Sequence, residues 1–133
     1  MALETIISIS ARFEDARGVS VGYSVSRKKI TSTFANRKAV KLVQTVGTAE
    51  EALNLGDLTG ATIKYVFLRN LDYTNYIQLR KATGEAACMR LEADVNQDGT
   101  GGVAVIPWES GVTAPFVIAN TAACDLEILI IPN

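Results

Sequence analysis

Residues 62–80 read TIKYVFLRNLDYTNYIQLR, and this stretch decides the fold class. Two short apolar segments, 62–70 and 76–80, are separated by LDYTN, which is rich in turn-forming residues. In the first segment, Ile63, Tyr65 and Phe67 alternate with Lys64, Val66 and Leu68. A period of two indicates a β-strand, and two largely apolar faces indicate that this strand lies in the centre of a sheet.

The same period of two recurs on both sides of this stretch. It is cleanest over residues 19–26, where apolar residues alternate with small polar ones, and it is also present over 7–13. Further strand-like segments, separated by turns, cover 39–46, 86–93, 103–108, 115–119 and 124–131. Short strands at regular spacing with little helix predict an all-β chain of eight to ten short strands, which form an antiparallel β-sandwich or a barrel. We favour the antiparallel β-sandwich.

Two segments leave alternatives open. Residues 49–55 (AEEALNL) contain good helix formers, and Thr48 with Glu51 has the spacing of a capping box, but a strand is nearly as well supported. Segment Arg27–Lys38 is basic and rich in Thr and Ser. We expect a long loop or arm there, with one short strand around Ile30–Phe34.

Composition indicates one folded domain. The chain has 133 residues, 48% of them hydrophobic and 20% charged, which suits a single β-sandwich domain over 1–133 and excludes intrinsic disorder. Its apolar runs are shorter than the roughly 20 residues of a membrane helix, and its first residues do not resemble a signal peptide. We therefore expect a protein that folds in a cytosol and does not contact a membrane.

The absence of histidine limits the chemistry. It excludes Ser/His/Asp and Cys/His catalysis and any histidine-ligated metal. The two cysteines, Cys88 and Cys124, form no CxxC pair, so a zinc site is not expected. Alternation places Cys124 on the face of Leu126 and Cys88 on the face of Arg90, and we expect two free, mostly packed thiols. No cofactor is predicted.

Four further patterns have a chemical and a structural interpretation. The first is the loop containing Asp94, Asn96 and Asp98, which matches the first half of a calcium loop. The twelfth position, however, is Val105 in place of a bidentate Glu, so a plain strand connection is the alternative. The glycine-rich run 99–102 lacks the lysine and helix of a phosphate-binding loop.

The other two patterns are the acidic residues and the aromatic residues. Paired carboxylates can hydrolyse glycosides, and the candidates are Glu50, Glu51, Asp57, Glu85, Glu92 and Glu109. No two of them are marked as a pair, so we do not predict an enzyme. The aromatic residues that are candidates for stacking on sugar rings are Tyr65, Tyr73, Tyr76 and Trp108. Packing at a sheet edge or an interface is the alternative for these rings.

Charge is distributed unevenly along the chain. The net charge is −1, but the residues through Lys41 include eight basic and three acidic ones. One interpretation is a basic arm that contacts an acidic partner, and the other is a solvated loop with scattered lysines. The residues that would form the contact are Arg27, Lys28, Lys29, Arg37, Lys38 and Lys41.

Several stretches resemble a known group of proteins. These are YVFLRNLD (Tyr65–Asp72), TNYIQLR (Thr74–Arg80) and the closing strand Asn120–Ile130. They are similar to small β-sandwich proteins encoded among the virion genes of tailed bacteriophages. The similarity covers about half the chain, and its motifs are strand and turn residues. It implies a jelly-roll-like sandwich and a structural role.

From this resemblance and the missing catalytic signals we expect a non-enzymatic bacteriophage virion protein. Capsid decoration or head–tail attachment is the favoured role, exercised as a homo-oligomer that binds major capsid or tail proteins after assembly in the host cytoplasm. The basic residues of the arm would contact an acidic capsid or tail surface. The alternatives are an RNA-packaging coat protein, with nucleic acid as a less favoured partner, and a carbohydrate-binding adhesion module.

Overall fold

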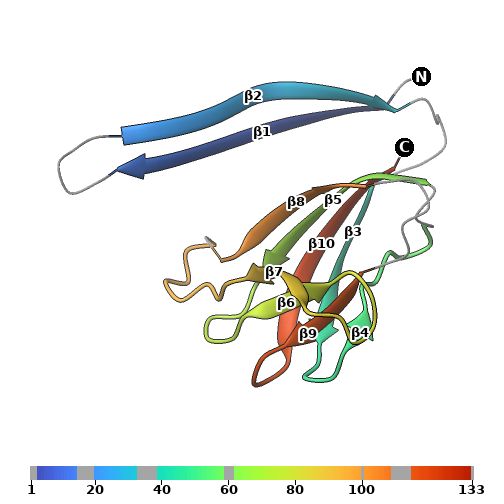
Figure 1. The fold of residues 1–133 in the computed structure, drawn as a ribbon. Coiled ribbons are helices and arrows are strands. Elements are labelled where there is room, and N and C mark those ends of the chain that lie inside the picture. Colours follow the sequence, from blue (N-terminus) through green and yellow to red (C-terminus); the bar gives the residue numbers. More distant parts are fainter. Residues whose placement is uncertain are drawn as a thin grey trace. The chain divides into compact units, whose positions relative to one another are not determined.

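A computed structural model describes residues 3–14, 20–32, 39–58, 62–99, 101–108 and 115–132. The chain divides into two compact units, residues 1–37 and residues 38–133. Within the described residues there are ten strands and no α-helix (Figure 1). One two-stranded sheet belongs to the first unit, and two four-stranded sheets belong to the second.

The first unit contains a long antiparallel hairpin. Strand β1 spans Leu3–Glu14 and strand β2 spans Ser20–Ser32, and the two run side by side in Figure 1. The loop predicted to begin at Arg27 is therefore wrong for residues 27–29, because this part of β2 pairs with β1, whereas the short strand expected around Ile30–Phe34 is present as far as Ser32. Such long-range pairing is not visible in local composition. Residues 33–38 lie outside the described residues.

Eight strands form the second unit. Their bounds are β3 Val40–Val46, β4 Glu51–Ala52, β5 Ile63–Asn70, β6 Ile77–Arg80, β7 Ala87–Leu91, β8 Val103–Pro107, β9 Phe116–Ala119 and β10 Cys124–Pro132. One sheet has the order β3–β10–β5–β8 and the other has the order β4–β9–β6–β7. All pairings are antiparallel. The predicted all-β antiparallel sandwich is confirmed.

The strand order is that of a jelly roll. Along the chain, the strands pass between the two sheets at every step except from β6 to β7, which are hairpin neighbours in one sheet. The first and last strands of this unit are neighbours in one sheet, where β10 lies between β3 and β5. Eight strands wound in this order form the two interlocked Greek keys of a jelly-roll sandwich. The strand order therefore agrees with the expected jelly-roll-like architecture.

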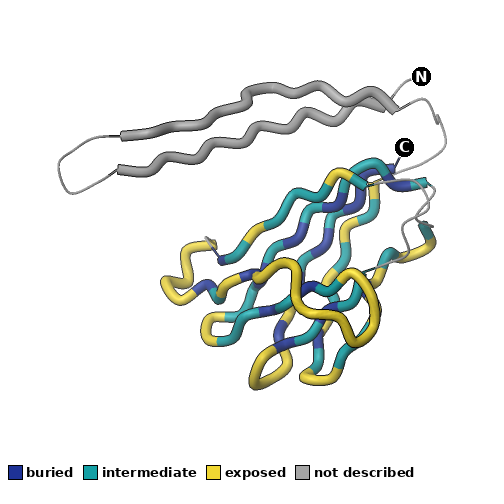
Figure 2. Tube along the Cα trace, viewed as in Figure 1, coloured by how far each residue is buried: buried dark blue, intermediate teal, exposed yellow. Residues whose placement is uncertain are grey.

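The core is built from alternate residues of the long strands. Along β10, Leu126, Ile128 and Ile130 are buried and alternate with more exposed residues, a pattern visible in Figure 2. Their cross-strand neighbours on β5 include Val66 and Leu68, which are also buried. Burying a side chain of this size stabilises a fold by about 1.5–3 kcal/mol, so these rows account for much of the sandwich's stability.

Strand β5 lies in the centre of its sheet, between β10 and β8, as the sequence predicts. Its alternation differs from the prediction in one place. Ile63 is buried on the side of Val66 and Leu68, and not on the side of Phe67. The reason is an irregularity in the pairing with β10 near Ile131, which shifts the register by one residue and moves Ile63 to the core side.

Residues 49–55 are extended and not helical. Glu51 and Ala52 form β4, which pairs with β9, and Leu53 is buried and donates its backbone N–H to the Pro115 carbonyl at 2.8 Å. The Glu51 carboxylate accepts hydrogen bonds from the Gln44 side chain at 3.2 Å and the Gly47 backbone at 3.3 Å. Burial of Leu53 in the sandwich thus overrides the weak local preference for a helix.

One buried polar side chain joins two loops. The amide of Asn70, at the end of β5, donates to the backbone carbonyls of Asn75 at 2.8 Å and of Leu91 and Glu92 at 3.1 Å each. Its oxygen accepts the backbone N–H of Asp72 at 3.0 Å. The amide nitrogen and oxygen of Asn70 therefore both have hydrogen-bond partners, as a buried amide requires.

Candidate functional site

The outer side of the β3–β10–β5–β8 sheet is the surface with the strongest functional signal. Two rows of cross-strand neighbours define it, and both face away from the core. The first row is Lys41, Leu129, Phe67 and Val105, and the second is Val43, Glu127, Arg69 and Val103. We call these eight residues the outer sheet face. Val43 is 55% exposed and Val103 is 60% exposed.

The charges on the outer sheet face are paired, with one carboxylate between two cations. Glu127 on β10 lies 3.1 Å from Arg69 on β5 and 3.7 Å from Lys41 on β3, so one carboxylate bridges both neighbouring strands. Thr45 donates a hydrogen bond of 2.8 Å to Asp125 beyond this group. A hollow of about 350 Å³ lies over the same residues. An apolar sheet surface with paired charges is typical of a surface that another protein covers.

The six basic residues predicted to make an electrostatic contact do not form one group. Lys41 is exposed on the outer sheet face, in the second unit. Arg27, Lys28 and Lys29 are consecutive residues of β2, in the first unit. Successive residues of a strand alternate between its faces, so these three do not share one side of the hairpin. Arg37 and Lys38 lie outside the described residues.

An apolar cavity of about 490 Å³ lies in the second unit, between β7 and β8. Its lining consists of Leu79, Lys81, Cys88, Met89, Ile106, Pro107, Trp108 and Pro115. The Cys88 thiol is already a donor to the Leu79 carbonyl at 3.4 Å. The lining therefore suits an apolar group and offers little that would orient a polar substrate.

The two cysteines are free, as predicted, but only one is packed. Cys124 is buried in the core and Cys88 is exposed, so the prediction of packing is wrong for Cys88. The reason is that β7 is an edge strand with four exposed residues out of five. Burial raises the pKa of the Cys124 thiol from 9.0 to about 11, and the charges of Asp72 and Asp125 add to this effect.

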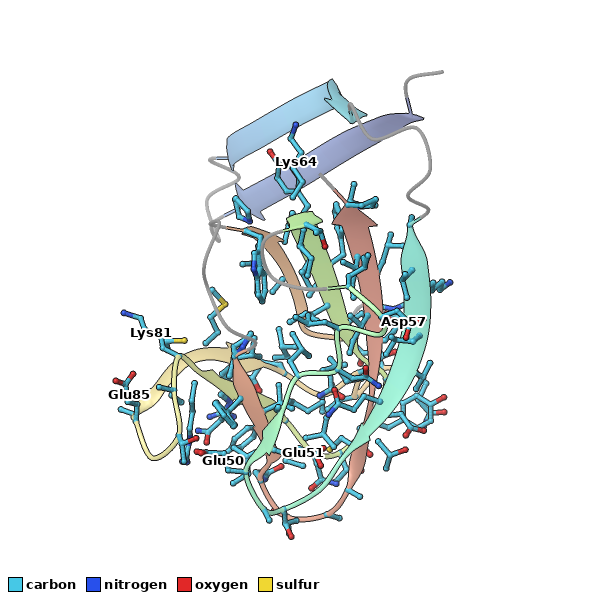
Figure 3. The ribbon with its side chains drawn as sticks, turned by 90° about the vertical axis from the view of Figure 1, so that its right-hand side faces the viewer. Glu50, Glu51, Asp57, Lys64, Lys81 and Glu85 are labelled. Atoms are coloured by element: carbon cyan, nitrogen blue, oxygen red, sulfur yellow. The ribbon has the colours of Figure 1, made fainter. Side chains whose placement is uncertain are left out.

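The candidate carboxylates Glu50 and Glu92 form ion pairs with different arginines. Glu50 forms an ion pair with Arg80 at 2.8 Å and accepts the Gly84 backbone N–H at 3.1 Å. Glu92 pairs with Arg90 at 2.8 Å. Figure 3 shows Asp57 far from Glu85, which lies beside the turn after β6. Glu109 is outside the described residues.

The Asp94 carboxylate accepts hydrogen bonds from the backbone of the loop in which it lies. Asp94 is buried, and its carboxylate accepts the backbone N–H groups of Asp98 at 3.3 Å and Gly99 at 2.9 Å. Gln97 and Gly99 adopt positive φ angles of 56° and 79°, which form the tight turn. Among the residues that the structure describes, no cluster of three or more acidic, cysteine or histidine side chains suits a metal ion. This geometry favours the plain connection.

The four aromatic residues do not share one platform. Trp108 lines the apolar cavity and its backbone is bonded to Lys64, at the beginning of β5. Tyr73 is exposed in the turn after β5, and the ring of Tyr76 lies under the Arg90 guanidinium at 3.6 Å. Trp108 lies beside the beginning of β5 and Tyr73 follows its end, so the length of the strand, roughly 25 Å, separates these two residues. A single sugar ring would not contact both.

Comparison of the chain with family models, with curated proteins and with solved structures finds no match. Within the part of the chain that the structure describes, no helix has the length and apolar character to cross a membrane. Sequence analysis did not single out Glu127, Arg69 or Val103. The signal was the cross-strand match of opposite charges, which becomes visible only once the register is known.

Proposed function

We propose that this chain is a non-enzymatic structural protein of a bacteriophage virion. Its role would be capsid decoration or head–tail attachment, as a homo-oligomer that also binds major capsid or tail proteins. The jelly-roll strand order supports the proposal because viral capsid proteins commonly use this architecture. Lectins and cupins use it as well, so the strand order alone does not assign the role.

The observation that carries the proposal is the outer sheet face. Val43 and Val103 are more than half exposed there and flank the Arg69–Glu127 ion pair. Exposed β-branched residues on a sheet face, between charges that already have partners, offer apolar contact without an unpaired charge to desolvate. Such a surface supports association with another protein.

The polar groups support binding more than catalysis. Glu50, Glu92 and Asp94 each have partners that fix a turn or a strand end, and these partners occupy their carboxylates. A general acid or base needs a carboxyl group that is free to exchange a proton with a substrate. The described carboxylates with such partners therefore serve the fold.

The test is co-sedimentation of the purified protein with empty capsids of the phage, comparing Val103→Lys with Val95→Lys. Both positions are exposed valines, at 60% and 69%, but Val95 lies in the loop after β7 and not on the outer sheet face. We expect Val103→Lys to weaken capsid binding about tenfold or more, since a buried unpaired ammonium is costly. Val95→Lys should bind as the unchanged protein does. Absence of binding by the unchanged protein would overturn the proposal.

A second candidate is favoured by one observation, the basic run Arg27–Lys29 on β2. Clustered cations neutralise phosphates, so an RNA-packaging coat protein would retain nucleic acid on purification in low salt. The ratio of absorbance at 260 nm to that at 280 nm separates the two candidates. A protein-like ratio supports the virion decoration role, and a nucleic-acid-like ratio supports the coat protein.

A further inference from the structure

The hairpin of the first unit contains a register shift with a consequence for its faces. Ile9 pairs with Val25, but Ile7 pairs with Lys28, so two residues of β2, Ser26 and Arg27, stand opposite one residue of β1. This is a β-bulge. In the sequence of β2 the apolar positions are odd before the bulge and even after it, as in Val25 and Ile30. The extra residue at the bulge therefore keeps Val25 and Ile30 on the same face of the hairpin.

As a result, one face of the hairpin is predominantly apolar, with nine apolar residues at its twelve paired positions. From the pairing register, the positions that share this face are Leu3, Thr5, Ile7, Ile9, Ala11 and Phe13 of β1 with Val21, Tyr23, Val25, Lys28, Ile30 and Ser32 of β2. The opposite face carries mostly Ser, Glu, Arg, Lys, Thr and Gly, with Ile6 as its apolar exception. Because the bulge lies where the alternation changes, most apolar residues of both strands stay on this face, and Lys28 is its one charged residue.

A two-stranded ribbon of this kind is at best marginally stable in water by itself. It needs a second layer over its apolar face, since strands are stabilised by packing that face against another surface. The outer sheet face offers an apolar sheet surface of the kind that packs on another sheet at about 10 Å. The two units thus carry two matching apolar surfaces.

The charges of the two units are complementary. Residues 1–37 contain six basic and three acidic side chains, and residues 38–133 contain seven basic and eleven acidic ones. The first unit therefore has an excess of positive charge and the second an excess of negative charge. Between separate copies, opposite charge favours the encounter of a hairpin with a sandwich and opposes hairpin–hairpin contact.

We propose that the hairpin of one copy docks its apolar face on the outer sheet face of a second copy. The inference rests on the proposed function, which takes the outer sheet face as an association surface, and names the hairpin as its occupant. The contact joins two different surfaces, so it is head-to-tail, and repetition produces a ring or a filament. The Lys41–Glu127–Arg69 group would lie in this contact with its charges already paired.

The experiment uses two variants that are each defective in one of the two surfaces. Ile9→Lys places a charge on the apolar face of the hairpin, and Ser10→Lys is its matched control, because the neighbouring position lies on the opposite face. Val103→Lys damages the outer sheet face, and Val43→Lys is an independent second variant of that face. The fluorescence of Trp108, the only tryptophan, reports whether the sandwich is folded in each variant.

Native mass spectrometry then measures association. We expect Ile9→Lys and Val103→Lys each to be monomers of 14.3 kDa, and Ser10→Lys to associate as the unchanged protein does. Mixing the two monomers should restore a mixed dimer, because the Val103→Lys copy keeps an intact hairpin and the Ile9→Lys copy keeps an intact outer sheet face. Two folded variants that remain monomers on mixing overturn the inference, as does a hairpin variant that associates normally.

The same samples separate this inference from the proposed function. If the mixed dimer forms but the unchanged protein does not bind empty capsids, the virion role is overturned and the hairpin contact is supported. Capsid binding by a protein that is monomeric with or without Ile9→Lys overturns the hairpin contact alone. A hairpin that covers the outer sheet face of its own copy also gives monomers throughout, and it counts against the inference.

Discussion

Glu127 on β10 lies 3.1 Å from Arg69 on the adjacent strand β5, at the centre of an otherwise apolar sheet surface. The same carboxylate reaches Lys41 on the other side, at 3.7 Å. One acidic residue therefore forms ion pairs with two basic ones from two neighbouring strands. Its removal tests whether this surface is used for association, because it changes the charge of the face without changing its shape.

Replacement of Glu127 by Gln should leave Arg69 and Lys41 unneutralised on the outer sheet face. We expect weaker association, measured as a higher concentration at half-assembly in sedimentation velocity, and partial recovery in high salt, which screens the cations. The free energy of unfolding should fall by about 1 kcal/mol or less, as for other partly exposed ion pairs.

The matched control for this change is Glu92→Gln. Glu92 also pairs with an arginine, Arg90, at 2.8 Å, but this pair follows β7 in the other sheet and is largely exposed. It should leave association unchanged. Equal effects of the two substitutions on assembly would show that loss of any ion pair is sufficient, and would contradict a special role for Glu127.

Truncation of Ile128 to Ala should remove part of the core. Ile128 is fully buried between the rows of β3 and β5, and a change of this kind costs about 2–5 kcal/mol. Urea denaturation measures the loss. Val43→Ala is the control, since Val43 lies on the same sheet but is 55% exposed, and its effect should stay within about 0.5 kcal/mol. Similar losses at both positions would contradict the assignment of inner and outer faces.

Alternation in the sequence was sufficient to predict this inner face and the fold class. The residues Leu126, Ile128 and Ile130 follow a period of two, and burial enforces that period. The outer sheet face was not predictable, because it depends on which strands are neighbours. Lys41 and Glu127 are far apart in the sequence, and only the antiparallel pairing of β3 with β10 places them together.

Local shifts of register were also beyond the sequence. Simple alternation groups Ile63 with Phe67, whereas the structure buries it on the opposite side of β5, and the loop expected from Arg27 is a strand as far as Ser32. An irregular pairing lies near each of these positions. The helix considered at 49–55 failed for a different reason, since the burial of Leu53 against β9 outweighs propensity. Pairing and burial are tertiary effects that composition does not contain.

Substitution of Gly102 by Ala should destabilise the second unit. A Cβ atom there would lie 2.2 Å from the Glu92 nitrogen, and the backbone of Gly102 bonds to both Glu92 and Asn70. Because the clashing atoms are backbone, relief requires moving the loop, and we expect a loss of about 1–3 kcal/mol. Gly47→Ala is the control, since its nearest neighbour would be 3.9 Å away. Equal melting temperatures of the two variants would contradict this tight packing.

The buried thiol of Cys124 should make stability depend on pH in alkaline solution. Its folded-state pKa is raised to about 11 from 9.0, so the unfolded chain loses its proton first as the pH rises. The stabilising contribution is fully present below pH 9 and is lost between about pH 9 and 11. Urea denaturation across this range should show a decline that Cys124→Ala reduces. An identical decline in that variant would assign the effect to other groups.

The reactivity of the two thiols at pH 8 tests the difference in burial between Cys88 and Cys124. The exposed Cys88 should react with Ellman's reagent in the folded protein, and the buried Cys124 should react only after unfolding. One equivalent should therefore become two on addition of denaturant. Cys88→Ser should abolish the fast reaction, and a fast reaction that survives this substitution would contradict the burial of Cys124.

The central claim, that the outer sheet face joins copies of this chain, is tested most directly by native mass as a function of protein concentration. We predict that the unchanged protein has a mass that is a multiple of 14.3 kDa at micromolar concentration, and that Val103→Lys remains at 14.3 kDa. An unchanged protein that stays at 14.3 kDa at every concentration, or a folded Val103→Lys variant that assembles equally well, would contradict it.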